Sequence, residues 1–526
     1  MNVAPAKIKS TDSTETPLFT KVLVANRGEI AVRILRALRD MGIIAVALAS
    51  DPDREAEHVR VADEVIFLPG RTSAETYLQG EKIITLAKAA EVQAIHPGYG
   101  FLSENADFAQ ACADAGLTFI GPTPSVMREM GDKIRAKALM EKAGVPVVPG
   151  WAGEADVPMA LVAEQAERVG YPLLVKAAAG GGGKGMRLVN GSDELEAAWH
   201  AAAREAQSAF GDARVFLERY IMSPRHVEFQ IFGDHHGHLV HLFERECSIQ
   251  RRHQKLIEEA PSPALIRNPD LRARMAEMAL KAAQAMAYTN AGTIEFIVDE
   301  TGNFYFLEVN TRLQVEHPIT EWTVQQDLVR LQIMVAAGLP LPFSQAEVHQ
   351  TGHAIECRIC AEDPASGFLP ATGRLAFYRP PEGPFIRVDT GVREGTDVTI
   401  YYDPLLAKLI VWGPNRASAL SRMSRALSQF VALGLPFNAP FLKTVIDHPA
   451  FRAGDTHTHF LETHQLASPL ASSDTPPIPL STEALFIGAL SAGLKRGRQS
   501  QSDINESVEQ PSPWDSGHAW RMGACL

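Results

Sequence analysis

Residues 293–318 read TIEFIVDETGNFYFLEVNTRLQVEHP, and this stretch decides the fold because it combines a hairpin pattern with a row of acidic side chains. Two runs rich in β-branched and aromatic residues, 293–299 and 304–310, flank the turn-forming sequence Glu-Thr-Gly-Asn. Strand-like runs separated by such a turn are typical of a β-hairpin. We therefore expect two antiparallel strands here.

The expected hairpin brings two carboxylates face to face. If Asp299 pairs with Phe304, Glu295 lies directly opposite Glu308, with Cβ atoms about 5 Å apart. Two carboxylates at that separation repel by roughly 3 kcal/mol at an effective dielectric of about 20, so a cation between them is favoured. Asn310 points to the same face, and oxygen ligands of this kind suit Mg²⁺. The alternative is an edge hairpin whose acids are solvated.

A glycine-rich segment upstream predicts a phosphate-binding loop. Residues 171–177 (YPLLVKA) have a strand pattern, and four consecutive glycines follow at 180–183. Without Cβ atoms, the backbone N–H groups there can wrap around phosphate oxygens. No helix pattern follows, which excludes a dinucleotide fingerprint, and a glycine after Lys184 excludes a Walker A loop. We expect a flap over ATP with Lys176 at its base; the alternative is a flexible surface hairpin.

Composition indicates a large globular protein with ordinary chemistry. The 526 residues give room for three to four domains, and 46% are apolar. The net charge of −12 argues against non-specific binding to nucleic acid or to an acidic membrane. No apolar run approaches the roughly 20 residues that span a bilayer. Residues 1–20 lack the apolar segment of a signal peptide, so we expect a disordered tail and a cytoplasmic protein.

Cysteines and clustered histidines are interpreted as structural. Five cysteines without secretory context argue against a disulfide framework. Cys357 and Cys360 match C-x-x-C, but they fall in an alternating strand pattern with no second pair to complete a zinc site. Four histidines surround a predicted hairpin turn, and we interpret them as solvated turn residues: His235, His236, His238 and His241.

Patterns along the chain predict several regions. Strand and helix periodicities alternate over residues 21–124, which favours a doubly wound parallel sheet. A helix over 133–143 ends at a glycine and leads into a lid over about 150–220. A strand-rich region covers 352–460. Residues 468–481 are rich in Ser and Pro and are typical of a linker.

Four blocks of sequence carry a resemblance to a known family. They are ANRGEIA at 25–31, HPGYGFLSEN at 96–105, ERECSIQRRHQK at 244–255 and EVNTRLQVEHP at 308–318. Together with the lysines and acids above, they resemble the ATP-grasp fold. More narrowly, the chain from about 21 to 460 resembles the biotin carboxylase component of biotin-dependent acyl-CoA carboxylases.

The resemblance implies an α/β fold with defined regions. They are a disordered tail (1–20), an N-terminal doubly wound parallel sheet (21–131), an ATP-grasp domain with a mobile lid (132–345) and a C-terminal strand-rich α+β domain (346–461). The last residues, 462–526, resemble a linker and the start of the subunit-tethering domain of methylcrotonoyl-CoA-type α-subunits, which we expect to be truncated. Neither Met-Lys-Met nor Ala-Met-Lys occurs, so we expect the biotin carrier on another chain or missing from this one.

The resemblance also implies the reaction and its participants. Biotin carboxylases use ATP to activate bicarbonate as carboxyphosphate and then carboxylate biotin. We expect Mg²⁺ or Mn²⁺, two ions per site, with biotin as a carboxyl acceptor carried elsewhere. Expected partners are a biotin carboxyl carrier and a carboxyltransferase β-subunit, and we expect a homo-oligomer without nucleic-acid or membrane partners.

The family's functional residues transfer onto matching positions of this sequence. The implied ATP-binding residues are Lys133, Lys176, Gly181, Gly182, Gly183, Glu218, His226, Gln250 and His253. The implied metal ligands are Glu295, Glu308 and Asn310. The implied bicarbonate and biotin residues are Lys255, Arg312, Gln314, Val315, Glu316, Tyr99 and Arg358, of which Glu316, Arg312, Lys255 and Arg358 are the expected catalytic residues.

The resemblance implies distinct roles for the catalytic residues. Glu316 accepts the bicarbonate proton, Lys255 lies near the γ-phosphate, and Arg358 stabilises the biotin enolate. The alternative for Glu316 is a structural ion pair with Arg312. Cys360 replaces the asparagine or aromatic residue of many relatives, which leaves the positioning around Arg358 open.

Three other functions compete with biotin carboxylation. Another ATP-grasp ligase would share the metal acids but lack the blocks at 96–105 and 308–318. A scaffold that docks a carboxyltransferase would not need intact catalytic positions. A nicotinamide oxidoreductase is suggested only by the glycine spacing. The acyl-CoA that is finally carboxylated stays open among methylcrotonoyl, geranyl, propionyl and acetyl thioesters.

Overall fold

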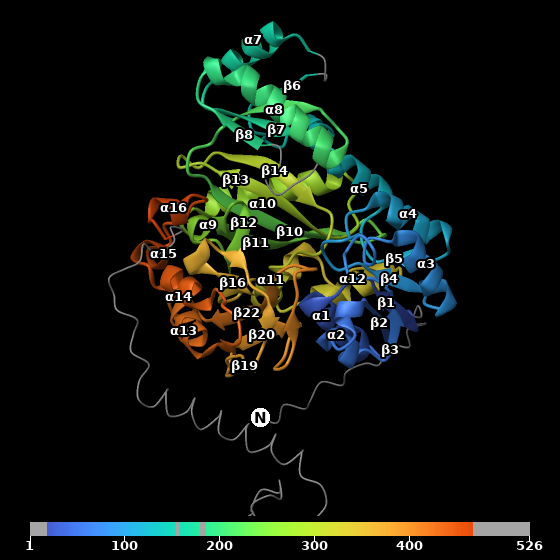
Figure 1. Ribbon diagram of the computed structural model, residues 1–526. Coiled ribbons are helices and arrows are strands. Elements are labelled where there is room, and N and C mark those ends of the chain that lie inside the picture. Colours follow the sequence, from blue (N-terminus) through green and yellow to red (C-terminus); the bar gives the residue numbers. More distant parts are fainter. Residues whose placement is uncertain (1–17, 154–156, 179–185, 467–526) are drawn as a thin grey trace, which may run out of the picture. The chain divides into compact units, whose positions relative to one another are not determined.

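The computed structural model describes residues 18–153, 157–178 and 186–466. Three predicted features lie outside these residues: the N-terminal tail up to residue 17, the glycines at 180–183, and the linker and tethering region from 467 onward. No helix in the described part is long and apolar enough to cross a bilayer. Helices and strands are labelled as in Figure 1.

The first region contains the parallel sheet that the sequence predicts. Its strand order is β3-β2-β1-β4-β5, and every pairing is parallel. The strands are β1 (Lys21–Val24), β2 (Ile44–Ala49), β3 (Glu64–Phe67), β4 (Ala94–His96) and β5 (Thr118–Phe119). The helices are α1 (Gly28–Asp40), α2 (Glu57–Val61), α3 (Gly80–Ala89), α4 (Ala106–Asp114) and α5 (Pro124–Gly131). The apolar stripe of α1 is buried, as its 3.6-residue period predicts.

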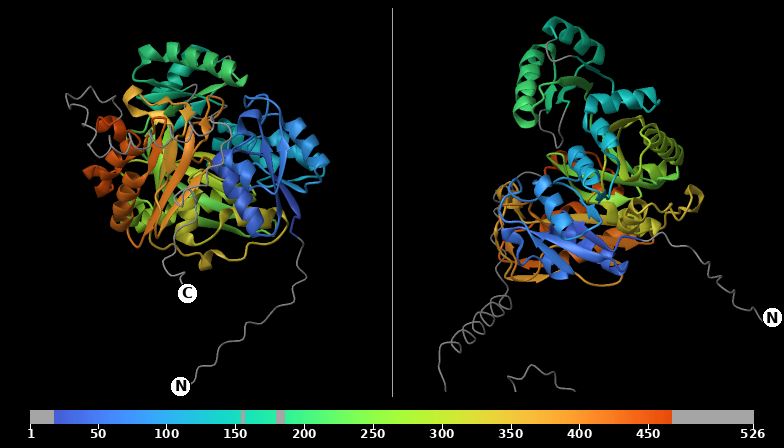
Figure 2. Two further views of the ribbon diagram at one scale, coloured as in Figure 1. Left: turned by 60° about the horizontal axis from the view of Figure 1, so that its bottom comes forward. Right: turned by 90° about the vertical axis from the view of Figure 1, so that its right-hand side faces the viewer.

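A separate four-stranded sheet occupies the predicted lid. Its order is β6-β9-β7-β8, with β6 (Gly150–Ala152), β7 (Leu173–Ala177), β8 (Met186–Val189) and β9 (Val215–Arg219). Helix α6 (Lys133–Lys142) leads into it, and α7 (Met159–Val169) and α8 (Ser192–Phe210) pack on it (Figures 1 and 2). Val175 and Trp199 belong to the buried core between sheet and helices.

An eight-stranded sheet carries most of the site. Its order is β14-β13-β10-β11-β12-β15-β22-β20. The strands are β10 (Arg225–Gly233), β11 (Leu239–Arg251), β12 (Gln254–Ala260), β13 (Asn290–Val298), β14 (Phe304–Asn310), β15 (His353–Cys360), β20 (Ile386–Thr390) and β22 (Leu405–Gly413). Because β12 pairs with β15, the sheet continues across the boundary expected at residue 345.

Helices and short strands complete the described part of the chain. The helices are α9 (Pro263–Arg267), α10 (Pro269–Ala285), α11 (His317–Val324), α12 (Leu328–Ala336), α13 (Arg416–Gln429), α14 (Ala439–Asp447), α15 (Pro449–Ala453) and α16 (Phe460–Thr463). The short strands are β16 (Glu362–Asp363), β17 (Leu369–Pro370), β18 (Gly373–Arg374), β19 (Phe377–Arg379), β21 (Asp397–Val398) and β23 (Val431–Leu433). Helix α13 packs on β15 and β22, so the region after residue 352 is α+β.

The hairpin of β13 and β14 confirms the facing acids but corrects the predicted register. Phe304 pairs with Val298 rather than with Asp299, which is one residue away from the expected alignment. A bulge on β14 then adds one residue and brings Glu308 opposite Glu295. Glu295 is only 4% exposed, so the alternative of solvated acids is wrong for Glu295, whereas Glu308 on the edge strand β14 has a side chain that is 37% exposed.

Three of the four histidines are exposed turn residues as predicted, and the prediction is wrong for His241. His235, His236 and His238 are exposed at the turn between β10 and β11, whereas His241 lies on β11 and is partly buried. Cys357 and Cys360 are free thiols on β15.

Candidate active site

One cavity of about 1060 Å³ collects the predicted site residues that the structure describes. Its wall is formed by the loop before α1, the lid strands β7 and β8, the eight-stranded sheet and the segment before α16. The predicted residues that line it are Tyr99, Lys133, Lys176, Glu218, His226, Gln250, His253, Lys255, Glu295, Glu308, Asn310, Arg312, Gln314, Val315, Glu316 and Arg358. Gly181, Gly182 and Gly183 lie outside the described residues.

The lid contributes a carboxylate held by two lysines. Lys176 on β7 donates to Glu218 on β9, and Lys137 on α6 donates to the same carboxylate at 3.3 Å. Burial alone would raise the pKa of Glu218, but the two ammonium groups outweigh it and lower that pKa. Lys137 was not predicted. It lies on the helix that begins at the predicted nucleotide residue Lys133, which was the available signal.

His226 connects the nucleotide residues to the acidic hairpin. Its Nε2 lies 2.8 Å from Glu295 Oε2, and its Nδ1 lies 2.6 Å from the amide nitrogen of Gln250. Because that amide nitrogen is a donor, Nδ1 accepts this hydrogen bond, and Nε2 faces the Glu295 carboxylate. His253 lines the same cavity, and partial desolvation there together with the charge of Lys176 lowers its pKa.

The hairpin acids and Asn310 fit a divalent cation. Asn310 donates to Glu295 at 2.7 Å, so these two side chains are already fixed relative to each other. Among the described residues, Glu308 forms an ion pair with Lys133 alone, at 3.9 Å. Partial burial and the charge of Glu295 raise the pKa of Glu308. A cation between the two carboxylates would relieve that repulsion, and oxygen ligands suit Mg²⁺.

Lys255 is the centre of the charge network. Its ammonium donates to Glu228 at 2.6 Å and to Glu295 and Glu316 at 2.7 Å each. Burial alone would lower the pKa of Lys255, but the three carboxylates outweigh it and raise that pKa well above its usual value. One cation therefore links the acidic hairpin to the predicted proton acceptor.

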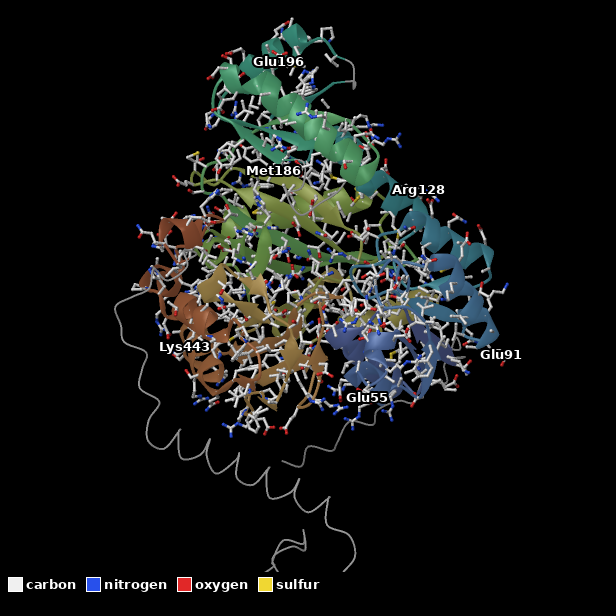
Figure 3. The ribbon with its side chains drawn as sticks, in the orientation of Figure 1. Glu55, Glu91, Arg128, Met186, Glu196 and Lys443 are labelled. Atoms are coloured by element: carbon white, nitrogen blue, oxygen red, sulfur yellow. The ribbon has the colours of Figure 1, made fainter. Side chains whose placement is uncertain are left out.

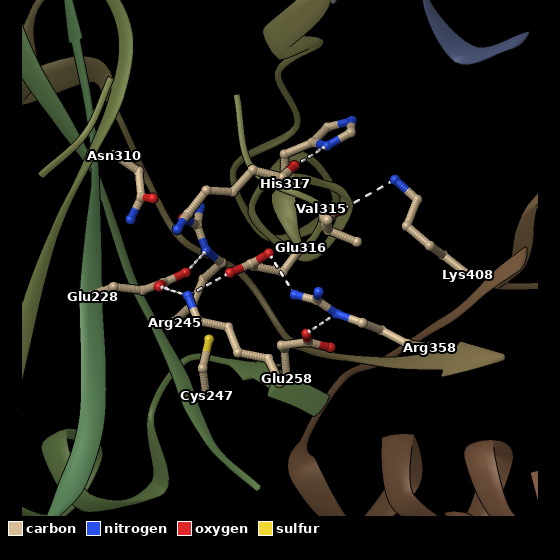
Figure 4. A network of polar contacts seen from close by, with 12 residues as sticks. Glu228, Arg245, Cys247, Glu258, Asn310, Val315, Glu316, His317, Arg358 and Lys408 are labelled. Carbon is tan, nitrogen blue, oxygen red and sulfur yellow. Dashed lines mark hydrogen bonds and ion pairs between the residues drawn. The ribbon is translucent and has the colours of Figure 1, made fainter. Parts of the chain in front are cut away.

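Glu316 lies between two cations, neither of which is Arg312. Its Oε1 accepts from Lys255, and its Oε2 accepts from Arg358 at 2.9 Å (Figure 4). Burial opposes ionisation, but the two cations hold the pKa of Glu316 well below its usual range. The alternative of an Arg312–Glu316 ion pair is wrong, because Arg312 instead donates to Glu104 at 3.0 Å.

Arg358 donates hydrogen bonds to two glutamates. Its Nε donates to Glu258 on β12 at 2.6 Å, while its Nη2 reaches Glu316 (Figure 4). Burial raises the pKa of Glu258 to about 7, although Arg358 opposes that rise. Cys360 lines the same cavity two residues along β15.

Sequence reasoning missed several residues of this network. Glu228 alternates with buried apolar residues on β10, and its register partner on β13 is Glu295. Arg245 lies within the block at 244–255, is fully buried and donates to Glu228 at 2.6 Å. Arg245 also donates to the side chain of Gln314. A charged residue on the polar face of a buried strand was the usable signal for both.

The geometry supports chemistry on anions. Lys255, Arg312 and Arg358 present donors to one cavity, and preorganised donors in a partly water-excluded site stabilise developing negative charge. Glu316 is ionised at neutral pH and can accept a proton. The hairpin acids provide a site for a divalent cation. These are the requirements of phosphoryl transfer to an oxyanion.

Comparisons with known proteins agree with this chemistry. Residues 18–127 match the biotin carboxylase N-terminal domain, 132–344 match the ATP-binding domain of the carbamoyl-phosphate synthase L chain, and 356–463 match the biotin carboxylase C-terminal domain. The α subunit of mitochondrial methylcrotonoyl-CoA carboxylase from Dictyostelium discoideum is 47% identical over 96% of this chain and 70% of its own length. Biotin carboxylase from Nostoc sp. is 52% identical over 84% of this chain and 99% of its own length.

A solved structure gives the same result. The biotin carboxylase domain of 2-oxoglutarate carboxylase from Hydrogenobacter thermophilus, in complex with MgADP, ADP and bicarbonate, has a TM-score of 0.83 and 46% identity. The match covers 86% of this chain and 99% of that domain. This chain spans 61–70% of the length of the methylcrotonoyl-CoA carboxylase α subunits it matches.

The relatives overturn one expectation and support another. The expected cytoplasmic location is contradicted, because the methylcrotonoyl-CoA carboxylase α subunits are named as mitochondrial proteins. Composition could not decide this, since net charge and the lack of an apolar segment do not distinguish one aqueous compartment from another. The expected family is confirmed by biotin carboxylase from Nostoc sp., which matches over 99% of its own length. The chain belongs to the biotin carboxylase family.

Proposed function

We propose that the residues of this cavity divide the two steps of ATP-dependent biotin carboxylation between them. The observation that supports the division is the position of Glu316, whose carboxylate contacts Lys255 with one oxygen and Arg358 with the other. Lys255, which we assign to the phosphate, and Arg358, which we assign to biotin, thus contact the same proton acceptor. The alternative of another ATP-grasp ligase is not favoured by the relatives.

In the first step, bicarbonate attacks the γ-phosphorus of ATP. A new phosphorus–oxygen bond forms to bicarbonate, the bond to the β-phosphate oxygen breaks, and ADP leaves with carboxyphosphate as the other product. Arg312, the side chain of Gln314 and the backbone of Val315 hold bicarbonate, while Glu316 takes its proton. Lys255 stabilises the charge that spreads over the phosphoryl oxygens.

A divalent cation supports this step when it is bound. Glu295, Glu308 and Asn310 would hold it, and it would neutralise charge on the nucleotide phosphates. We propose Mg²⁺, with Mn²⁺ as a substitute and two ions per site. Lys133, Lys176 and Glu218 bind the nucleotide from the lid side, with His226, Gln250 and His253 on the opposite wall.

In the second step, carboxyphosphate breaks its bond between carbon and the bridging oxygen and releases CO₂ and phosphate. The phosphate takes the proton of the ureido N–H of biotin, and that nitrogen forms the new bond to the carbon of CO₂. Arg358 stabilises the enolate oxygen of the ureido group, and Tyr99 packs near the ring. Glu258 keeps the Arg358 guanidinium oriented, because it binds Nε and leaves Nη2 directed at Glu316.

The wider assembly follows from the relatives. We propose a biotin carboxyl carrier and a carboxyltransferase β-subunit as partners and methylcrotonoyl-CoA as the final carboxyl acceptor, because the relatives that match over most of this chain are named methylcrotonoyl-CoA carboxylase. We also propose a homo-oligomer and retain the domain boundaries given above.

Phosphate release tests the proposal. The purified protein is supplied with MgATP, and bicarbonate and free biotin are omitted in turn. We expect ATP cleavage that requires bicarbonate and is stimulated by biotin. ATP turnover that depends on neither bicarbonate nor biotin would overturn the assignment.

A further inference from the structure

Lys408 on β22 is a fully buried lysine that none of the roles above uses. Its ammonium donates to the carbonyl oxygen of Val315 at 3.0 Å (Figure 4). It also lies 3.2 Å from Glu29 Oε2 and 3.7 Å from Asp389 Oδ2. Burial alone would lower the pKa of Lys408, but the surrounding carboxylates outweigh it and raise that pKa. The ammonium is therefore charged at neutral pH.

The carbonyl of Val315 belongs to the peptide whose N–H is that of Glu316. In a planar trans peptide the C=O and the N–H point in opposite directions, so a hydrogen bond on one side orients the other. The preceding carbonyl is held as well, because the Nδ1 of His317 lies 2.7 Å from Gln314 O (Figure 4). Lys408 and His317 thus hold the carbonyls of two consecutive peptides in the segment that leads to Glu316.

Lys408 is directly opposite Arg358 in the register of β15 and β22. Like charges that face each other across strands are destabilising. Two facing cations at this position therefore suggest that each has a role at the site. The two cations contact consecutive residues: Arg358 contacts the carboxylate of Glu316, and Lys408 contacts the carbonyl oxygen of Val315. One strand pair therefore holds both the Glu316 side chain and the peptide that leads into it.

The anchors of Lys408 come from distant parts of the chain. Glu29 lies at the start of α1, and Asp389 lies on β20. Directly after β20, Gly391 allows the backbones to approach, since a Cβ there would lie 2.5 Å from the backbone nitrogen of Glu29. Helix α1 and the end of β20 therefore lie close together, and each provides a carboxylate near the Lys408 ammonium.

We propose that Lys408 is a positioning residue for bicarbonate activation. Its ammonium holds the Val315 carbonyl and thereby sets the orientation of the peptide that carries Glu316. This rests on the proposed roles of Val315 in binding bicarbonate and of Glu316 in accepting its proton. Lys408 itself contacts neither nucleotide nor bicarbonate in this proposal.

Charge-balanced substitutions test the proposal. Lys408→Met removes the donor and keeps the chain length, but it leaves Glu29 without its cation. The double variant Lys408→Met with Glu29→Gln removes that buried carboxylate charge as well. The matched control is Lys443→Met on the surface of α14, where the lysine pairs only with Asp447 among the described residues (Figure 3). Melting temperature, kcat, and KM for bicarbonate and for ATP are measured for each.

We expect the double variant to regain much of the melting temperature that Lys408→Met loses, while both keep an impaired bicarbonate step. We expect kcat/KM for bicarbonate to fall about tenfold or more, which is the scale of one charge-assisted hydrogen bond. KM for ATP should change less than about twofold. Recovery of both melting temperature and bicarbonate kinetics in the double variant would overturn the proposal, as would equal losses for ATP and bicarbonate.

Two further variants keep the outcome decisive. If neither methionine variant folds, Glu29→Gln alone leaves the ammonium in place but removes one anchor, and a raised bicarbonate KM with an unchanged ATP KM supports the proposal. Unchanged bicarbonate kinetics in that variant contradict it. Glu316→Gln separates the two levels of inference: if it has no effect, the proposed function fails, and if only the Lys408 variants have none, this inference fails alone.

Discussion

Replacing Glu316 by glutamine removes the proposed proton acceptor while nearly preserving its shape. The carboxylate accepts one hydrogen bond from Lys255 at 2.7 Å and one from Arg358 at 2.9 Å. Glutamine can accept only one of them, and its amide N–H groups then face the other cation. Lys255 retains Glu228 and Glu295 as partners, so the network loses one member rather than its centre.

The magnitude follows from general acid–base catalysis. Loss of a positioned base costs about 10²–10⁴-fold in rate, which is about 3–5 kcal/mol in the barrier. Nucleotide affinity should change little, because Lys176 and Glu218 on the lid do not contact Glu316. The assay measures ADP affinity by calorimetry and bicarbonate-dependent phosphate release over a range of bicarbonate concentrations.

Glu321→Gln is the matched control for this substitution. Glu321 lies on α11, is 5% exposed and pairs with Arg33 at 2.8 Å and Arg387 at 2.7 Å. It therefore also removes a buried carboxylate held by two cations, but it does not line the main cavity. We expect Glu321→Gln to lower stability and leave bicarbonate-dependent turnover per folded molecule largely intact. Loss of ADP binding in Glu316→Gln, or equal losses of turnover in both variants, would refute the reasoning.

Three further predictions concern the metal acids, the biotin step and acid stability. Glu295→Gln and Glu308→Gln should each abolish most ATP cleavage and raise the Mg²⁺ concentration that gives half-maximal rate; wild-type rates at ordinary Mg²⁺ would show that the acids are only structural. Arg358→Ala should reduce carboxybiotin formation far more than biotin-independent ATP cleavage, and equal reduction of both would contradict its assigned role. Burial alone would raise the pKa of Glu259, but Arg416 and His353 outweigh burial and lower that pKa from 4.5 to about 2. The ionised Glu259 therefore contributes about 3 kcal/mol to the unfolding free energy above pH 4.5, and this contribution is lost as the pH falls toward 2. Glu259→Gln should therefore lower the unfolding free energy at pH 7 more than at pH 3, and a penalty that does not shrink in acid would be inconsistent with this linkage.

The acidic hairpin shows what the sequence could and could not predict. Strand propensity and the turn predicted both strands, and alternation predicted that Glu295 and Glu308 share a face. The assumed pairing of Asp299 with Phe304 was wrong by one residue, and the bulge on β14 compensated for it. A bulge inserts a residue without a distinctive pattern, so the correct pair was reached through an incorrect alignment.

Partner choice within the site was less predictable than residue identity. Glu316 and its expected role came from the family resemblance, whereas local sequence suggested Arg312 as its ion-pair partner. The actual partner Arg358 is 42 residues away and arrives through the pairing of β12 with β15. Lys408 is 93 residues from Val315, and nothing in its strand pattern distinguishes it from a solvated lysine. Such contacts depend on tertiary strand order, which periodicity does not encode.

The eight-stranded sheet illustrates the same limit at the level of domains. Local patterns separated a central half from a strand-rich region that begins near residue 352. The structure joins them through one ladder, in which Glu258 faces Glu356. Hydrogen bonding between strands far apart in sequence decides this continuity, so composition and linker signals could not show it.

Transfer of labelled bicarbonate to biotin tests the central claim most directly. The protein is incubated with MgATP, isotopically labelled bicarbonate and free biotin, and carboxybiotin is quantified alongside phosphate for wild type and Glu316→Gln. We predict label on biotin only when ATP is present, with formation reduced about 10²–10⁴-fold in the variant. Carboxybiotin that forms at the same rate in Glu316→Gln, or ATP cleavage by the wild type that never labels biotin, would contradict the account.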